Sequence, residues 1–428
     1  MRFPCKKRSK KSRNTIMEDE TTQNFRGDQN IRIRMSIRDL QEPENSVYRY
    51  AFLKAFNKIK NLPINDPDCF WNIASTNAQP FYVMRTTPAQ STKIWRGYSQ
   101  HENVLFLPWY RAYLSHLEQA LIRQAPPSEK QLVALPFWDS TSDESMTSGL
   151  PDLLMDDYVT IDTYDNQIPN PLLGYTLPKA ISLAESDPKF AKPLGYTTRR
   201  YPFSSLRDST NPQYETPDAK IQNHYIMQSF KNPKFYLQEN VIYALNNGIE
   251  QAFKDSLEIE GYNPFSNVSS QGNQTSLEDA SNKVLEALGG DVNNKQLLGG
   301  ALGDIGVKEM AAFDPLFFLH MANIDRVFWL WQVKFHTDPF VITQGAGDQG
   351  IKAKYGQGPS PNQTGNENLT NLSNLYPFIQ PASDPQRFVN CNDLMDIKTQ
   401  LGYRYSRGSF GTTAPEEDIK QNKRNRKF

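Results

Sequence analysis

His101 and Tyr110 are the residues of this 428-residue chain whose types and spacing first suggest chemistry. An imidazole titrates near neutral pH, so His101 could act as a general acid or base. Tyr110, nine residues further on, could donate a proton or orient a carbonyl oxygen. Such a set could run a cyclisation, elimination or rearrangement by proton transfer, whereas dioxygen chemistry would need a metal or cofactor. The competing interpretation is a histidine and a tyrosine that merely satisfy each other inside a core.

A predicted helix that begins near Pro108 must position Tyr110. Proline suits the first turn of a helix, because its missing N–H is not needed there and its φ is already helical. Apolar residues then recur at helical spacing and make one buried stripe; they are Trp109, Ala112, Tyr113, Leu117, Ala120 and Leu121. His101 lies on the approach to this helix.

Two further helices carry the remaining candidates. One is predicted over 276–288, where Ser276 and Asp279 resemble a capping box and a Gly-Gly pair ends the helix. The other starts at Asp314 and Pro315, which can cap and open a helix, and runs to about residue 332. The rest of the chain predicts a short strand at 31–35, helices at 47–62 and 241–257, loops at 69–81, 82–100 and 343–375, an irregular stretch at 140–215 and a closing segment at 395–405.

The charge balance and the cysteine count of the chain limit its possible partners and its cellular compartment. Lys plus Arg and Asp plus Glu are both 47, so the net charge favours neither nucleic acid nor a membrane. Three cysteines do not make a disulfide framework, and no apolar run of signal-peptide or membrane length follows the basic start. We therefore expect a cytoplasmic protein with a small-molecule partner. Its oligomeric state cannot be deduced from these features.

No repeat or interdomain linker interrupts the pattern, so we expect one mainly α domain over residues 31–410. Residues 1–30 are predicted to be a disordered basic tail and residues 411–428 a basic C-terminal tail. A nuclear-import or anionic-surface role for these termini is the alternative.

Several motifs, in order along the chain, resemble the tyrosinase, catechol oxidase and haemocyanin family, and most closely its short fungal catechol-oxidase-like members. These motifs are CFWNIASTNAQPF (69–81), GYSQHENVLFLPWYRAYL (97–114), LPFWD (135–139), RYPFSSL (200–206), SLEDASNKVLEALGG (276–290), AAFDPLFFLHMANIDRVFWLWQ (311–332) and LGYRY (401–405). The resemblance covers most of residues 31–405 and implies a central four-helix bundle with long irregular loops and a few short strands.

That family binds two copper ions with six histidines, three for each metal. In this chain the resemblance places the six ligand positions at Asn77, His101, Tyr110, Ser281, Leu285 and Met321. His320 would be the last ligand if the register there slipped by one residue. The position at which some members link a cysteine covalently to a copper histidine falls at Ser99.

Five of the six implied ligand positions therefore hold other residues, whereas the framework residues Asn282, Phe317, Asn323, Asp325 and Arg326 match the family. The whole chain has five histidines, so a dinuclear copper site is not expected, and at most a weak mononuclear metal would bind at His101. Without metal, the centre of the bundle would be a largely apolar pocket. By the resemblance, its floor would hold Asn77, His101, Tyr110, Ser281, Asn282, Leu285, Phe317, His320 and Met321. Asn77 and Ser281 could then hydrogen-bond a polar substrate.

Three functions follow from this resemblance. The first is a metal-independent enzyme of specialised metabolism, acting by acid–base chemistry on a small aromatic, polyketide-like or alkaloid-like substrate. The second is a non-catalytic binding protein in which Ser281, Leu285 and Met321 only fill the vacated centre. The third is a copper-dependent phenol or catechol oxidase with atypical ligands.

Overall fold

The structure is a computed structural model that describes most of the chain between residues 31 and 411. The described residues are 31–77, 97–181, 192, 194–198, 200, 233–289, 303–306, 308, 310–337, 339–354, 367–380 and 386–411. The chain divides into two units, Met1–Ile31 and Arg32–Phe428, and nearly all described residues belong to the second. The two basic tails lie outside the described residues, apart from Gly411, so their prediction stays open.

Helices dominate the described residues, as the sequence predicts. The α-helices are α1 (Ile37–Gln41), α2 (Ser46–Lys60), α3 (Phe70–Asn77), α4 (Phe106–Gln124), α5 (Asp143–Ser148), α7 (Pro233–Ala244), α8 (Glu250–Leu257), α9 (Tyr262–Ser266), α10 (Leu277–Gly289) and α11 (Pro315–Phe335). A π-helical turn, Leu245–Ile249, joins α7 to α8. Short 3₁₀ turns occur at Pro43–Asn45, Lys130–Leu132, Asp152–Leu154, Asp304–Gly306, Ala311–Phe313, Gln349–Ile351 and Cys391–Asp393.

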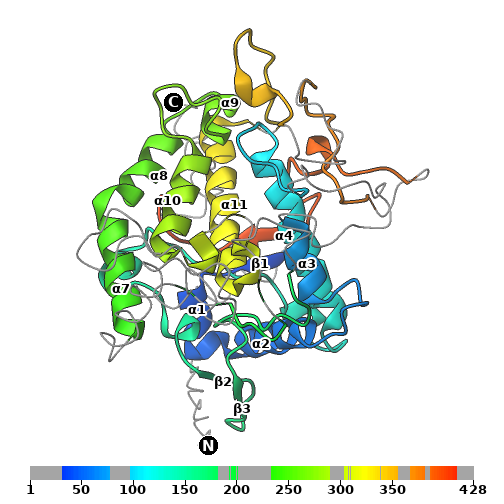
Figure 1. Cartoon of the computed structure of the whole chain (residues 1–428), viewed down its shortest axis with the longest axis vertical. Coiled ribbons are helices and arrows are strands. Elements are labelled where there is room, and N and C mark those ends of the chain that lie inside the picture. The colour runs from blue at the N-terminus through cyan, green and yellow to red at the C-terminus, as the bar shows by residue number, and fades with distance from the viewer. Residues whose placement is uncertain are drawn as a thin grey trace, which may run out of the picture. The chain divides into compact units, whose positions relative to one another are not determined.

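The long helices α4 and α11 pack against each other at the centre of this unit (Figure 1). α10 packs on α11, α7 and α8, while α2 packs on α4 and α3. The ends of α11 follow local chemistry: the Asp314 carboxylate accepts from Leu316 N, Pro315 is the first helical residue, and His336 ends the helix with φ +52°. α11 is apolar nearly all round because it is buried nearly all round.

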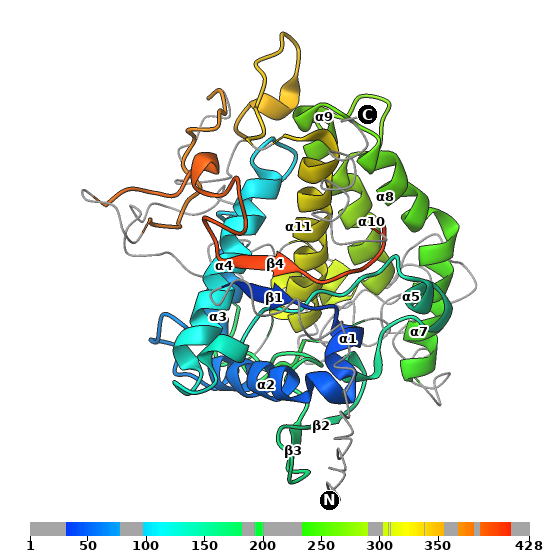
Figure 2. The same cartoon turned by 180° about the vertical axis from the view of Figure 1, so that it is seen from behind.

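Two small sheets accompany the helices. β1 (Arg32–Arg34) pairs in parallel with β4 (Tyr403–Tyr405), with Arg32 opposite Tyr403, and confirms the short strand predicted near residue 31. Figure 2 shows this pair lying across α4 and α11. β2 (Tyr158–Thr160) and β3 (Gln167–Pro169) form an antiparallel hairpin within the stretch predicted to be irregular.

A buried carboxylate, Asp325 of α11, connects the sheet of β1 and β4 to the central helices. Its Oδ1 accepts from Arg111 Nε of α4 at 2.5 Å, and its Oδ2 accepts from the hydroxyls of Tyr403 and Tyr405 at 2.6 Å each. Arg34 Nη1 of β1 lies 3.4 Å from the same Oδ2. Burial alone would raise the pKa of Asp325, but Arg111 and Arg34 lower it, so the carboxylate stays charged.

The prediction of a loop over 69–81 is wrong for residues 70–77, which form α3. Every residue of α3 is buried, so its apolar residues show no one-sided stripe for a sequence pattern to detect. The continuous helix predicted over 241–257 is also wrong. It breaks at Asn247 (φ −111°, ψ 51°) and Gly248 (φ +115°), a conformation that glycine adopts readily.

The end of α10 fits the predicted stop at Gly289. A Cβ atom at this position would lie 2.5 Å from Gly306 Cα, so the close approach of the two backbones requires glycine. Among the described residues, no helix is both long enough and apolar enough to cross a membrane.

Replacing Asp325 by alanine should destabilise the fold by about 3–5 kcal/mol, because Arg34 and Arg111 would lose a buried counter-charge. Urea denaturation at pH 7 measures this loss. The matched control is Lys254→Ala, which removes an exposed i,i+4 pair with Glu250 and should cost less than about 1 kcal/mol. Equal losses in the two variants would contradict the importance assigned to Asp325.

Candidate functional site

His101, Tyr110 and Asn77 form one hydrogen-bonded chain, which brings together three of the residues singled out from sequence. His101 lies just before α4, and its Nε2 is 3.0 Å from the Tyr110 hydroxyl. Tyr110, in the second turn of α4, donates to Asn77 Oδ1 at 2.9 Å, and Asn77 is the last residue of α3. The side chain of His101 is 14 % exposed, whereas Tyr110 and Asn77 are buried. His101 is therefore the partly exposed member of these three residues.

Glu278 completes this chain from α10, and the sequence analysis missed it. Its Oε1 lies 3.2 Å from His101 Nδ1. Both carboxylate oxygens accept from Glu102 N at 3.0 Å, and Oε2 also accepts from Val268 N at 3.2 Å. Because two backbone N–H groups donate to it, the Glu278 side chain is held in position beside His101. The signal that could have revealed Glu278 is its place in the first turn of α10, three residues before Ser281.

The hydrogen-bond roles in this chain can be assigned by counting donors. Asn77 Nδ2 donates to Lys308 O at 3.4 Å, which turns Asn77 Oδ1 towards Tyr110. Tyr110 therefore donates its single proton to Asn77, and its oxygen accepts from His101 Nε2. His101 Nδ1 lies within hydrogen-bond distance of Glu278. Both ring nitrogens of His101 are thus engaged with protein groups.

The Tyr110 phenol stays protonated in this setting. Burial raises the pKa of Tyr110 well above its ordinary value, and the Glu278 charge raises it further, against a smaller lowering by a hydrogen bond with Ser99. Aromatic rings surround the phenol: the centroids of Phe106 and Phe317 lie 5.1 and 6.0 Å from that of Tyr110. Tyr110 is therefore a neutral hydrogen-bonding group surrounded by aromatic side chains.

Ser281, His320 and Met321 form a second cluster one turn further along α10. Ser281 Oγ lies 2.9 Å from His320 Nε2 and donates to Met321 Sδ at 3.8 Å. His320 is fully buried, its Nδ1 has no hydrogen-bond partner among the described residues, and burial lowers its pKa to about 3. His320 is therefore a neutral imidazole. Both His320 and Met321 reach Ser281, so this contact does not decide between them for the last ligand position.

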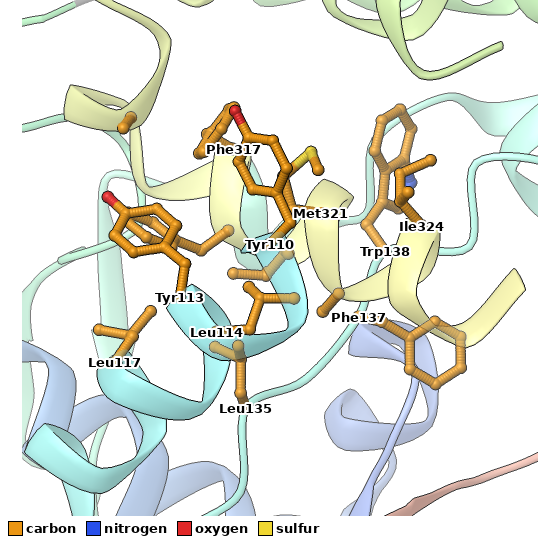
Figure 3. Close-up of a cluster of buried hydrophobic side chains, with 14 of the residues drawn as sticks. Tyr110, Tyr113, Leu114, Leu117, Leu135, Phe137, Trp138, Phe317, Met321 and Ile324 are labelled. Atoms are coloured by element: carbon orange, nitrogen blue, oxygen red, sulfur yellow. The ribbon is translucent and has the colours of Figure 1, made fainter. Parts of the chain in front are cut away.

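Apolar side chains close the space around these polar groups. Figure 3 draws Tyr110, Phe317 and Met321 within one buried cluster at the junction of α4 and α11. Leu285 is 8 % exposed and lies one turn beyond Ser281 on α10, while Asn282 beside it is only partly buried. The structure thus places all nine sequence-predicted site residues on α3, α10, α11, or in or just before α4.

The residues gathered at this site do not fit a pair of copper ions. Two imidazoles are present, His101 and His320, and both nitrogens of His101 are already engaged. Leu285 and Tyr110 supply no neutral nitrogen donor, and a thioether with one imidazole is a poor set for a divalent metal. Within the described ranges, no group of three or more His, Cys, Asp or Glu side chains could hold a metal ion. His116 packs on Phe378, His336 ends α11, and His224 lies outside the described residues.

Comparison with known proteins identifies the family. The family model described as the common central domain of tyrosinase matches residues 67–334, so the chain belongs to the tyrosinase family. It is 32% identical to "Tyrosinase HcTyr2" of a Hahella species over 91% of this chain and 76% of that protein. It is 31% identical to a tyrosinase of Aspergillus oryzae over 90% of this chain and 75% of that protein.

Solved structures agree with this assignment. A tyrosinase from Burkholderia thailandensis superposes with a TM-score of 0.74 at 30% sequence identity, covering 91% of this chain and 77% of that one. A mushroom tyrosinase, at 22% identity and a TM-score of 0.67, shares the fold. The predicted mainly α, tyrosinase-like architecture is confirmed.

His320 should make folding stability depend on pH. Its folded-state pKa lies below that of the unfolded chain, about 6.5, so the unfolded state binds the extra proton first as pH falls. The contribution of neutral His320 is present above pH 6.5 and is lost towards pH 3, by at most about 1.4 kcal/mol per pH unit.

Urea denaturation of wild type and His320→Gln at pH 7, 6, 5 and 4 measures this slope. The variant should show a shallower loss. Met321→Leu is the control, because it disturbs the same Ser281 contact without removing a titrating group. Parallel curves for wild type and His320→Gln would contradict the assignment.

Proposed function

We propose that this member of the tyrosinase family works without a dicopper centre, as a metal-independent enzyme of specialised metabolism. The proposed reaction is a non-oxidative cyclisation, elimination or rearrangement driven by proton transfer. One observation carries the proposal: Glu278, His101, Tyr110 and Asn77 form a continuous hydrogen-bonded chain at the place where the family resemblance puts metal ligands.

Each group in this chain has a chemical role. His101, the partly exposed member of this chain, gives a proton from Nε2 to a developing oxyanion or carbanion that takes the place of the Tyr110 hydroxyl there, and takes a proton back at a later step. Glu278 holds the ring in place and stabilises its positive charge, since the carboxylate is fixed by backbone N–H groups of Glu102 and Val268. Tyr110 holds the other ring nitrogen and is itself held by Asn77.

The surroundings favour a flat, largely apolar substrate. The ring of Phe106 lies 5.8 Å from that of His101, and Phe317 packs on Tyr110. Aromatic walls with a few polar groups bind planar small molecules well. The proposed substrate class is therefore a small aromatic, polyketide-like or alkaloid-like metabolite.

A non-catalytic binding protein is the second candidate function. The near-complete burial of several site residues favours it. Ser281, His320, Met321 and Phe317 are each at most 2 % exposed, as expected of residues that fill a vacated centre. In this interpretation the hydrogen-bonded chain only satisfies buried polar groups.

A copper-dependent phenol or catechol oxidase with atypical ligands is the third candidate. It is supported by the relatives named tyrosinase, to which the chain is 31–32% identical. The donor set described above argues against it.

Elemental analysis separates the third candidate from the other two. The purified chain is analysed before and after incubation with copper, and oxygen uptake with a simple catechol is recorded on the same sample, beside an authentic tyrosinase. We expect copper far below stoichiometry and no uptake above background. Near-stoichiometric copper with turnover would overturn the proposal.

Substitutions separate the enzyme from the binding protein. Compounds of the proposed class are screened by thermal shift and then assayed for conversion. His101→Ala and Tyr110→Phe should lower the rate of conversion by roughly 10²–10⁴-fold, the usual contribution of general acid–base groups. His336→Asn, at the exposed end of α11, should leave the rate unchanged. Full activity in both site variants would refute the catalytic role.

A further inference from the structure

Outside the candidate site, the amine of Lys60 lines a separate surface cavity. Lys60 is the last residue of α2, and its side chain lines a 440 Å³ cavity together with Asn57, Asn61, Tyr175 and Thr176. Lysine ammonium groups normally point into water, so an amine partly buried at the wall of a cavity is unusual.

The contacts of this amine suit its neutral form. Nζ donates to Pro171 O at 2.8 Å and to Gly174 O at 2.5 Å. A neutral amine has two N–H bonds, which these two carbonyls satisfy, and one lone pair that remains for an electrophile.

Burial of Lys60 acts in the same direction. It lowers the pKa of Lys60 to about 8, against a partial raising by the Asp314 carboxylate, which exceeds the smaller lowering by the Arg200 guanidinium. Arg200 is itself paired with Asp314 at 2.8 Å, so this carboxylate is not free to neutralise Lys60. Burial keeps the neighbouring Tyr175 phenol protonated by raising its pKa. Roughly a tenth of Lys60 is therefore uncharged at pH 7, far more than for a lysine with the ordinary pKa of about 10.4.

We propose that Lys60 is a covalent attachment site for small, polar aldehydes or ketones. The Nζ lone pair attacks the carbonyl carbon to give a carbinolamine. Loss of the carbinolamine hydroxyl as water, with the nitrogen protons supplying its hydrogen, leaves an imine, so amine plus carbonyl compound gives imine plus water. The side-chain amides of Asn57 and Asn61 and the Thr176 hydroxyl can hydrogen-bond the rest of such a molecule.

The test labels the intact full-length protein with glyceraldehyde and cyanoborohydride at pH 7.5, which reduces each imine to a stable secondary amine. Peptide mass mapping over time gives the labelling rate at every lysine of the same sample. Lys58, exposed on the same helix, is the internal control. Lys60 should label on the order of tenfold or more faster than Lys58, since the neutral fraction of an amine changes tenfold per pKa unit.

Two more results test the same proposal. The labelling rate at Lys60 should level off above about pH 8, and Lys60→Arg should remove the fast-labelled peptide while Lys58→Arg leaves it. A rate at Lys60 equal to or below that at Lys58 would overturn the proposal and leave Lys60 as a structural contact to the 171–174 backbone. The measurement needs no substrate for the candidate site, so it stands or falls independently of the proposed function.

Discussion

The interaction on which the rest of the structure depends is the buried charge cluster around Asp325. Asp325 comes from the middle of α11 and binds Arg111 of α4, Arg34 of β1 and the two tyrosines of β4. Chain segments more than 350 residues apart thus meet at one carboxylate. The cluster fixes α4 against α11, and these two helices supply Tyr110 and the Phe317–Met321 segment of the candidate site. The scaffold is held by charges away from the site, so residues within the site could change while the helices kept their places.

α10 supplies a hydrogen-bond partner for each of the two imidazoles in the candidate site. Glu278 and Ser281, one turn apart on α10, each fix one imidazole. Their effects on the two histidines differ because the surroundings differ: His101 reaches solvent and has a carboxylate partner, whereas His320 is fully buried and has only a hydroxyl. Of these two histidines, His101 is the one that reaches solvent, which is why the proposed chemistry rests on it.

Local chemistry made the starts of the helices predictable from the sequence. The burial of α3, the break at Gly248 and the role of Glu278 were not predictable, each for a different reason. Asp314 and Pro315 open α11 through groups two residues apart, so the sequence shows them directly. α3 has no stripe because it is buried on every side, and the break at Gly248 needed only local backbone geometry that a periodic pattern overlooks. The pairing of His101 with Tyr110 was considered from sequence. Glu278 was missed, because its partners Glu102 and Val268 come near it only when the chain folds.

The backbone carbonyls of residues 171–174 connect the Lys60 cavity to the start of α11. Lys60 holds the backbone of Pro171 and Gly174, and Arg200 holds Leu172 between them. The same Arg200 binds Asp314, the N-cap of the helix that carries Phe317 and His320. The wall of the Lys60 cavity and the start of α11 are therefore joined by an unbroken series of hydrogen bonds through residues 171–174 and Arg200.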